Sequence, residues 1–399
     1  MKKYEIVSLL TAILMVALSG ICFFASAKPI TGTRELKAGF IYSGDASSPY
    51  TQNFISSEQA LRTKYNNSVE ILSVSNVQVE RAEEVIRGFC DEGCNLIISS
   101  GVEFCDIVKK LAGEYPGVQF CQACGSNADV APVYDNYHTF MGEICEGRYV
   151  EGIAAGMKLN EMLHKGTVKE NEAYLGYVAA FPNPEIISGY TAYFLGARSA
   201  CSSAKMKVRY TETWNNYTKE KEAAIRLIDE GCVIISQHTD TIAPAVACEE
   251  AAQDRTVYHV GYHQSMMDVA PTTSLVSTRI NWTPYILGAA EAVRRGVPIE
   301  SYVKGHVHGH DIGAGFDLDW VRMVELNTYE AAPGTKEAME DAENALKRGE
   351  LQIFRGDYTG VDPFDPTDTI DLKQGYKENE FCSAPAFHYV LDDYVEVLK

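Results

Sequence analysis

Polar and aromatic residues follow many of the short apolar segments in this sequence, at the positions where strands would end. Carboxylates and amides there can orient a small molecule through hydrogen bonds, and aromatic rings can stack on a planar one. We therefore predict one ligand site, made of Asp45, Tyr50, Gly101, Glu103, Phe181, Trp214, Asp240, His263, Asn281 and Trp282. For any single aromatic residue, packing inside the protein is the alternative role.

Two roles are open for Asp240. It follows the apolar segment 232–239, so its carboxylate can accept hydrogen bonds from a ligand. It also precedes a predicted helix over 241–253, where Asp is a favoured N-cap residue. Replacement by Asn separates these roles, because an amide can still cap a helix but offers the ligand fewer acceptors.

Short apolar segments alternate with amphipathic helices along most of the chain. In residues 80–93, apolar residues recur at the spacing of one helix face, and Gly93 closes the helix. Two further helices are predicted over 146–163 and from Asn281-Trp282 to Arg295. Strands are predicted over 36–44, 69–77, 94–101, 118–125, 173–180, 206–213, 232–239, 257–263 and 274–280. This alternation predicts an α/β fold with parallel, doubly wound sheets.

One segment of the sequence recurs. Residues 81–101 parallel residues 221–238, and Asp-Glu-Gly-Cys stands at 91–94 in the first and at 229–232 in the second. This repeat indicates two lobes of similar topology, with each cysteine a small residue at the start of a buried strand. Ligands of open α/β sheets bind beyond the carboxyl ends of the strands, so we expect the site in a cleft between the lobes.

Composition narrows the classes of function. The chain has 399 residues, 46% of them hydrophobic, and a net charge of -19. Because nucleic-acid binding needs a basic face, we expect no nucleic acid among the partners. The acidic balance suits a neutral or cationic small molecule. The chain contains no P-loop, no Gly-x-Gly-x-x-Gly opening a helix after the first strand and no Gly-x-Ser-x-Gly, so we predict a binding protein and not an enzyme.

The N-terminus has the organisation of a secretory signal. Lys2 and Lys3 precede an uncharged stretch that ends in Ala25-Ser26-Ala27, so residues 1–27 are predicted to be a cleaved signal peptide. Two alternatives are lipidation at Cys22, where Ile21 occupies the place of the usual small residue, and an uncleaved membrane anchor. Each of the three interpretations places the mature protein outside the cytoplasm.

Two other groups of residues could carry chemistry. Cys121 and Cys124 are spaced as a disulfide or redox pair would be, although a buried thiol is the more ordinary role. His306, His308 and His310 alternate as on one face of a strand and could bind zinc or copper, although a solvated loop is the simpler interpretation. We predict no metal and no cofactor.

Three segments, residues 171–200, 210–241 and 275–296, resemble the basic-membrane-protein family of bacterial substrate-binding proteins, which includes purine nucleoside receptors of ABC importers. Residues 98–120 and 147–156 agree more loosely. The resemblance implies a type I periplasmic-binding-protein fold, with two Rossmann-like lobes that close on a ligand. It implies an N-terminal lobe of residues 36–160 plus about 282–318, and a C-terminal lobe of 161–281 plus about 319–399.

The same resemblance implies a purine base or nucleoside as ligand and the permease subunits of an ABC transporter as partners. Family pocket positions correspond to Trp214, Asp240 and the pair Asn281-Trp282, while Asp45 and Tyr50 lie in a divergent loop. At Ser265 many relatives carry Asp, so one carboxylate contact of the family is missing here. The alternatives are a sensory binding protein for a membrane receptor and a nucleoside-processing enzyme.

Overall fold

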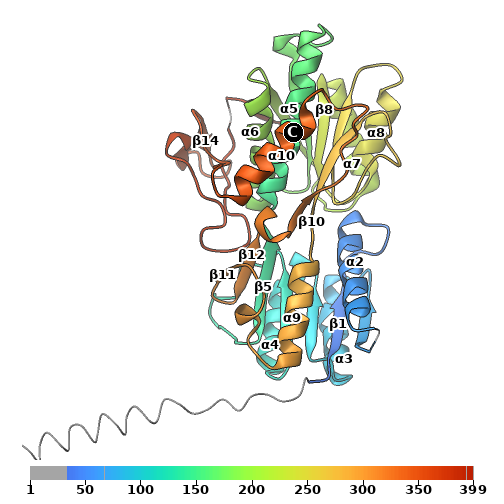
Figure 1. The fold of residues 1–399 in the computed structure, drawn as a ribbon, viewed down its shortest axis with the longest axis vertical. Coiled ribbons are helices and arrows are strands. Elements are labelled where there is room, and N and C mark those ends of the chain that lie inside the picture. Colours follow the sequence, from blue (N-terminus) through green and yellow to red (C-terminus); the bar gives the residue numbers. More distant parts are fainter. Residues whose placement is uncertain (1–33, 67, 392, 399) are drawn as a thin grey trace, which may run out of the picture.

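Two mostly parallel sheets organise the chain in the computed structural model, which describes residues 34–66, 68–391 and 393–398 (Figure 1). The first has the strand order β11-β12-β5-β4-β3-β1-β2, and the second has the order β13-β10-β9-β8-β6-β7-β16. In both sheets only the first strand of this order, β11 or β13, is antiparallel to its neighbour. The predicted signal peptide (residues 1–27) and Cys22 lie outside the described residues.

The strands of the first sheet are β1 (Lys37–Ile41), β2 (Glu70–Val74), β3 (Leu96–Ser99), β4 (Gln119–Ala123), β5 (Tyr137–Gly142), β11 (His306–His308) and β12 (Asp311–Ala314). Those of the second are β6 (Tyr174–Ala179), β7 (Lys205–Tyr210), β8 (Cys232–His238), β9 (Tyr258–Tyr262), β10 (Ser274–Ile280), β13 (Val321–Met323) and β16 (Val395–Leu398). A separate hairpin consists of β14 (Thr359–Val361) and β15 (Thr369–Asp371). Every strand predicted from the sequence is present, within a few residues at its ends.

Helices cover the faces of both sheets (Figure 1). With the first sheet they form the first lobe: α2 (Pro49–Lys64), α3 (Val79–Asp91), α4 (Cys105–Glu114) and α9 (Thr283–Arg295). With the second sheet they form the second lobe: α5 (Ile144–His164), α6 (Pro184–Ala200), α7 (Tyr217–Asp229), α8 (Ala243–Ala251) and α10 (Thr335–Lys347). Within the described residues, no helix has both the length and the apolar character to cross a membrane.

Helix α5 packs most closely on α6, and glycines permit this approach. A Cβ atom on Gly152 would lie 2.0 Å from the carbonyl oxygen of Tyr193, and one on Gly196 would lie 2.0 Å from that of Tyr149. The small residues of segment 147–156 are therefore packing positions between two helices. Because α5 packs on the second lobe, this contact favours a lobe boundary ahead of Ile144, whereas the sequence pattern suggested residue 160; the full division into lobes stays a prediction.

The recurring Asp-Glu-Gly-Cys segment has the same local structure in both lobes. Gly93 and Gly231 follow helices α3 and α7 and both have φ of +88°, a left-handed conformation that glycine adopts without steric cost. Cys94 and Cys232, which come next, are both 2% exposed and lie at the entry to a buried strand. The repeat therefore marks equivalent helix-to-strand turns.

Three segments connect the lobes within the described residues: one after β5, one after β10 and one between β12 and β13. They lie side by side. The amide of Asn281 donates to the carbonyl of Trp320 at 2.7 Å, and that of Glu143 donates to Ala314 at 2.9 Å. Because few segments join the lobes, relative motion of the lobes is the default expectation.

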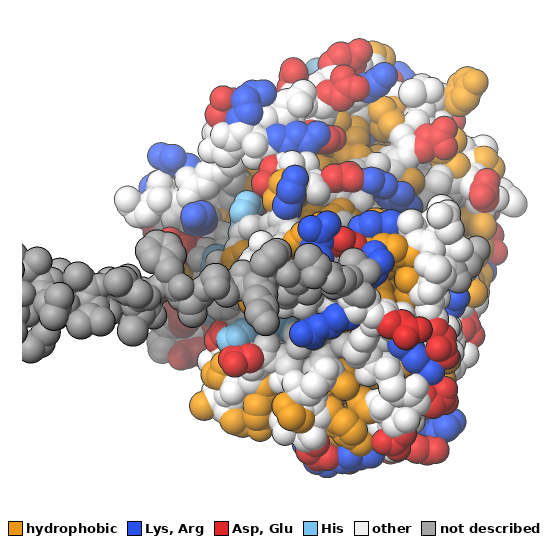
Figure 2. Space-filling view, turned by 60° about the horizontal axis from the view of Figure 1, so that its bottom comes forward, with side chains coloured by type: hydrophobic (Ala, Val, Ile, Leu, Met, Phe, Trp, Pro, Cys, Tyr) orange, Lys and Arg blue, Asp and Glu red, His pale blue; other side chains and the backbone are white. Residues whose placement is uncertain are grey.

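The surface carries charges of both signs. On the face shown in Figure 2, acidic and basic side chains are interspersed with hydrophobic ones. Although the chain has a net charge of -19, the described part of this face therefore has no single continuous acidic patch.

Candidate functional site

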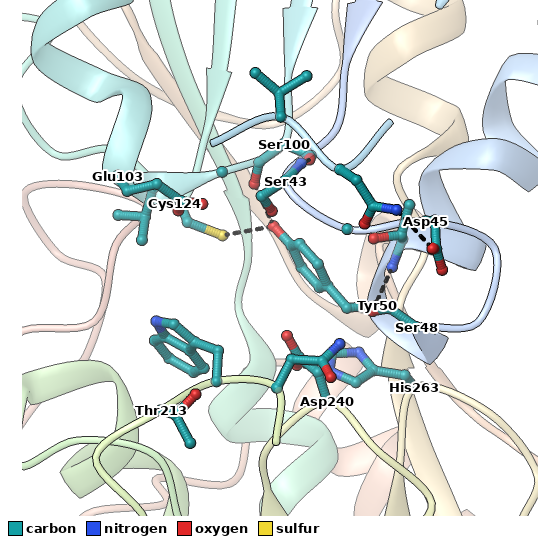
Figure 3. A pocket seen from close by; sticks show the side chains of 18 of the residues that line it. Ser43, Asp45, Ser48, Tyr50, Ser100, Glu103, Cys124, Thr213, Asp240 and His263 are labelled. Atoms are coloured by element: carbon teal, nitrogen blue, oxygen red, sulfur yellow. Dashed lines mark hydrogen bonds and ion pairs between the residues drawn. The ribbon is translucent and has the colours of Figure 1, made fainter. Parts of the chain in front are cut away.

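A cavity of about 540 Å³ lies between the carboxyl ends of the strands of both lobes. In Figure 3, Ser43, Ser100, Glu103 and Cys124 face Thr213, Asp240 and His263 across an open space. The first lobe contributes the turns after β1, β2, β3 and β4, and the second lobe those after β6, β7, β8 and β9. This is the position that the sequence predicts, where both sheets present their strand ends to one ligand.

Tyr50 projects from the start of α2. The helix begins there because Ser48 is its N-cap, accepting from the amide of Thr51 at 3.3 Å, and Pro49 occupies the first turn. The Tyr50 hydroxyl donates to the carbonyl of Ser100 at 2.6 Å and lies 3.7 Å from the Cys124 sulfur. The hydroxyl is therefore held by the first lobe, and Tyr50 lines the cavity.

Asp45 organises the loop after β1. One of its carboxylate oxygens accepts from the amide and hydroxyl of Ser47 at 2.8 and 2.6 Å, and the other accepts from the Asn76 side chain at 2.7 Å. Hydrogen bonds from Ser47 and Asn76 lower the pKa of Asp45 to about 2. Asp45 lines the cavity, but both its oxygens already have partners within the first lobe.

Trp214 and Asp240 are positioned together by the second lobe. The amide of Asp240 donates to the carbonyl of Trp214 at 2.8 Å. Below them the buried Glu220 of α7 accepts from the Asn216 amide at 3.0 Å and from the amide and hydroxyl of Thr241 at 3.1 and 2.6 Å. One buried carboxylate thus connects the loop after β7 to the loop after β8 and fixes the spacing of the two site residues.

The carboxylates of Asp240 and Glu185 face the cavity with little compensation. Burial raises the pKa of Asp240 to about 7, and burial followed by repulsion from Asp240 raises that of Glu185 to about 7. Their neighbours are His263, 3.1 Å from Asp240, and His238, 3.8 Å from Glu185. Burial holds the pKa of both histidines well below the usual range, so neither supplies a positive charge.

The structure excludes one of the two roles of Asp240, that of helix N-cap. Helix α8 begins at Ala243, with Ile242 at its N-cap and no side-chain capping bond. The Thr241 hydroxyl accepts from the Ala243 amide at 3.2 Å instead. The N-cap role for Asp240 was wrong, because the helix starts two residues later than the sequence pattern indicated.

His263 adopts an unusual backbone conformation at the end of β9. Its φ is +70°, in the left-handed region that non-glycine residues seldom occupy. The backbone is held there by its amide, which donates to Thr278 at 2.8 Å, and by its carbonyl, which accepts from Asn53 at 3.3 Å. Its ring lies 3.5 Å from that of Tyr262, between centroids. The strained turn aims the imidazole at Asp240.

Eight of the ten predicted site residues line the cavity: Asp45, Tyr50, Gly101, Glu103, Phe181, Trp214, Asp240 and His263. Asn281 and Trp282 do not. Asn281 lies at a connection between the lobes, where its side chain donates to the carbonyl of Asp319 at 2.8 Å. Trp282 is 1% exposed and stacks on Phe54 with 4.5 Å between centroids. In this structure Asn281 and Trp282 therefore have packing and connecting roles next to the cavity and do not line it.

Several other lining residues were not predicted as ligand contacts, among them Asn76, Cys124, Glu185, Glu212 and Thr213. The sequence feature that could have identified Glu185 is its position after a predicted strand. It lies in the first turn of α6, which follows β6 and has Asn183 as N-cap. Cys124 lies inside the segment predicted as a strand over 118–125, one residue after the end of β4 at Ala123. The rule that selected Asp240, a polar residue after a strand, would have found Glu185 but not Cys124, a thiol within the predicted strand.

The cysteine and histidine groups have simpler surroundings than a redox or metal site. Cys121 and Cys124 are free thiols. His306 and His308 lie in β11, where His306 contacts Glu143 at 2.6 Å, and His310 contacts Asp129 at 2.8 Å. Separate carboxylates therefore bind His306 and His310, and the two rings do not share one partner.

Comparison with known proteins decides the family. The model of the Bmp family, described as ABC transporter substrate-binding protein PnrA-like, matches residues 36–352. The chain belongs to this family. A purine-binding protein of Brucella abortus is 30% identical over 324 residues, which cover 81% of this chain and 84% of that protein. An ABC transporter glucose-binding protein of Haloferax volcanii is 33% identical over 275 residues, covering 69% and 63%.

Solved structures agree on the fold. A solute-binding protein of an ABC transporter from Conexibacter woesei superposes with a TM-score of 0.61 at 18% identity, covering 79% of this chain and 97% of that one. The family and the two-lobed α/β periplasmic-binding-protein fold predicted from the sequence are thus confirmed. The protein is a solute-binding component for ABC transport, and its family is one of binding proteins of the extracytoplasmic type, not of enzymes.

Proposed function

We propose that the protein binds a purine base or nucleoside in the cavity between its lobes and presents it, on lobe closure, to an ABC permease at the outer face of the cytoplasmic membrane. The composition of the cavity wall supports this proposal. Aromatic rings and carboxylates from both lobes converge there, and the described residues of the wall include no Lys or Arg to pair with the carboxylates. A volume of about 540 Å³ lies in the range of small-molecule sites, roughly 300–1,000 Å³.

Aromatic residues supply the surface for a planar ring system. Phe181 and Trp214 lie edge to face with 5.7 Å between centroids, and Tyr50 contributes from the other lobe. Stacking of a base on such a ring contributes about 1–3 kcal/mol. A purine inserted between Trp214 and the first lobe would contact both lobes and so favour the closed state.

Carboxylates supply acceptors for the donor groups of the ligand. Glu185 and Asp240 lie in the second lobe and Glu103 lies opposite, where burial also raises its pKa. An ionised carboxylate only accepts hydrogen bonds, which suits ribose hydroxyls and purine N–H groups. Burial of these charges on closure is offset only where the ligand donates to them.

The charged side chains that line the cavity are acidic. Among the described residues that line the cavity there is no Lys or Arg, whereas Asp45, Glu103, Glu185, Glu212 and Asp240 are all acidic. A phosphate would meet carboxylates without a counter-ion, which is strongly unfavourable. We therefore expect a nucleoside to bind and its 5′-phosphate to be rejected. The purine-binding relative supports this ligand class.

A binding panel tests the proposal. The chain has three tryptophans, and Trp282 and Trp320 are buried at 1% and 0% exposure, so a change in tryptophan fluorescence on binding would report on Trp214. Titration with adenosine, guanosine, inosine, the free bases, the 5′-monophosphates, glucose and amino acids should give saturation with a base or nucleoside only. Saturation with glucose and not with any purine would overturn the ligand class.

Two further measurements distinguish binding from its alternatives. Incubation with the bound nucleoside should release no free base, whereas release would indicate a nucleoside-processing enzyme. Small-angle scattering should show a smaller particle at saturating ligand, because the ligand stabilises the closed form. Identical profiles with and without ligand would contradict closure.

A further inference from the structure

The C-terminal segment contains a second group of converging side chains, outside the family match that ends at residue 352. The β14–β15 hairpin lies in this segment, and its connecting loop carries Asp362 and Asp368 at its two ends. The amide of Asp362 donates to the carbonyl of Asp368 at 3.0 Å, which closes the loop. Pairing of Val361 with Val390 brings His388 alongside.

Three potential ligand atoms in this group face one another. The Nε2 atom of His388 lies 3.5 Å from Oδ2 of Asp368 and 3.9 Å from Oδ2 of Asp362. One oxygen of each Asp and one ring nitrogen of His388 all lie within 4.8 Å of one another. Donors at the corners of a tetrahedral zinc site, about 2.0–2.2 Å from the ion, are themselves about 3.3–3.6 Å apart. The two His388–Asp spacings of 3.5 and 3.9 Å are close to this range.

The remaining polar atom of each residue is anchored elsewhere. Asp362 accepts through Oδ1 from the Phe364 amide at 2.8 Å, and Asp368 accepts through Oδ1 from the Tyr389 hydroxyl at 3.1 Å. His388 lies with Nδ1 2.9 Å from the carbonyl of Ala386. A carbonyl only accepts, so Nδ1 donates to it, and Nε2 faces the carboxylate of Asp368 at 3.5 Å. Such outer contacts are those that orient metal ligands.

We propose that Asp362, Asp368 and His388 bind a divalent transition-metal ion of the zinc class, which fastens the chain around His388 to the β14–β15 hairpin. Two carboxylate oxygens and one imidazole nitrogen face one point, where a single cation would be within reach of all three. An imidazole with two carboxylates suits zinc better than calcium or magnesium, which take mainly oxygen ligands in larger number. The side chains are 18%, 44% and 35% exposed in that order, which leaves room for a water as fourth ligand.

The test uses the full mature chain, purified without a histidine tag and dialysed against a chelator. Calorimetric titration with Zn²⁺ at pH 7.5 should show one site, and Zn²⁺ should raise the melting temperature in a way that a chelator reverses. Asp368→Asn and His388→Gln should each weaken Zn²⁺ binding about tenfold or more. Asp357→Asn is the matched control, since it removes an exposed carboxylate that pairs with Lys373 in the same segment.

His308→Gln is a second control, because the His306–His310 tract offers other imidazoles. Normal Zn²⁺ binding by both controls, together with loss in Asp368→Asn and His388→Gln, supports the site. Absence of Zn²⁺ uptake by the wild type, wild-type affinity in His388→Gln, or loss in His308→Gln alone would overturn it. Circular dichroism establishes that the variants fold. No residue of this segment lines the described cavity, so the result is independent of the purine proposal.

Discussion

Asp45 and Asp240 lie on opposite edges of the same cavity, yet they differ in what surrounds their carboxylates. Asp45 has three hydrogen bonds from Ser47 and Asn76, and its pKa is lowered to about 2. Asp240 has one neighbouring imidazole, and burial raises its pKa to about 7. A satisfied carboxylate shapes its own loop, whereas a buried one with spare acceptors is available to a ligand.

The difference extends to the lobes. On the first-lobe edge, Tyr50 also uses its hydroxyl internally, on Ser100. On the second-lobe edge, the buried Glu220 accepts the hydrogen bonds that hold the loops after β7 and β8. The side chains of Asp240, Glu185 and Trp214 are therefore not needed for this and line the cavity. We infer that the second lobe supplies most of the polar recognition and that the first lobe mainly completes the enclosure.

The largest effect is expected from Asp240→Asn. The amide keeps the shape but loses the charge and one acceptor, so purine affinity should fall by about 1.5–3 kcal/mol, or roughly 10- to 150-fold. The variant should still fold, because Asp240 does not cap α8. Calorimetry with the identified ligand measures the loss, and wild-type affinity would remove Asp240 from the site.

Trp214→Ala should have the next largest effect. Loss of the stacking surface should weaken purine binding by about 1–3 kcal/mol, or roughly 5- to 150-fold. Trp282→Phe is the matched control, since this ring is buried against Phe54 outside the cavity. That variant should lose stability and keep its affinity. Equal affinity loss in both variants would show that packing, and not stacking, determines binding.

Most of the fold could be predicted from the sequence, because buried parallel strands are nearly continuous apolar runs bounded by turn residues. Helix α2 could not be predicted from amphipathic periodicity, since it buries polar residues such as Asn53 and Glu58. The segment after residue 352 was also beyond prediction. Its strands are three or four residues long and give little periodic signal.

The site was predictable to the extent that it follows strand ends. That rule identified eight lining residues but did not separate Asp45 from Asp240, because the difference lies in hydrogen bonds from Ser47 and Asn76. It also included Asn281 and Trp282, which come after β10 at a connection between the lobes. The position of a residue after a strand does not predict whether its side chain will point into the cavity or away from it.

Binding should depend on pH with a definite sign. In the free protein the pKa of Asp240 is about 7, and a ligand that donates to its ionised form lowers it. Affinity should therefore rise about tenfold from pH 6 to pH 8, with release of protons at the lower end. Calorimetry across this range tests the effect. Asp240→Asn should give a shallower profile, with Glu185 responsible for what remains; an unchanged slope would contradict the assignment.

Stability of the free protein should move the opposite way. Because the folded-state pKa of Asp240 is raised above its ordinary value near 3.9, the folded protein retains the proton as the unfolded chain loses it. This stabilising contribution is complete below pH 4 and is lost as the pH rises through 7. Melting temperatures of wild type and Asp240→Asn should therefore diverge between about pH 4 and pH 7 and stay apart above pH 7, with the variant the more stable there.

The smallest effect is expected from Asp45→Asn, and it should appear in stability and not in affinity. The amide can still accept from Ser47 through one oxygen but loses the charged partner of Asn76. Because the folded-state pKa of Asp45 is lowered to about 2, its contribution is present above pH 4 and is lost as the pH falls toward 2. The small difference in melting temperature between wild type and variant should thus disappear over that acid range.

Purine affinity of Asp45→Asn at pH 7.5 should match that of the wild type, since both oxygens of Asp45 are already used within the first lobe. A loss of affinity as large as that of Asp240→Asn would show that the two edges of the cavity contribute alike.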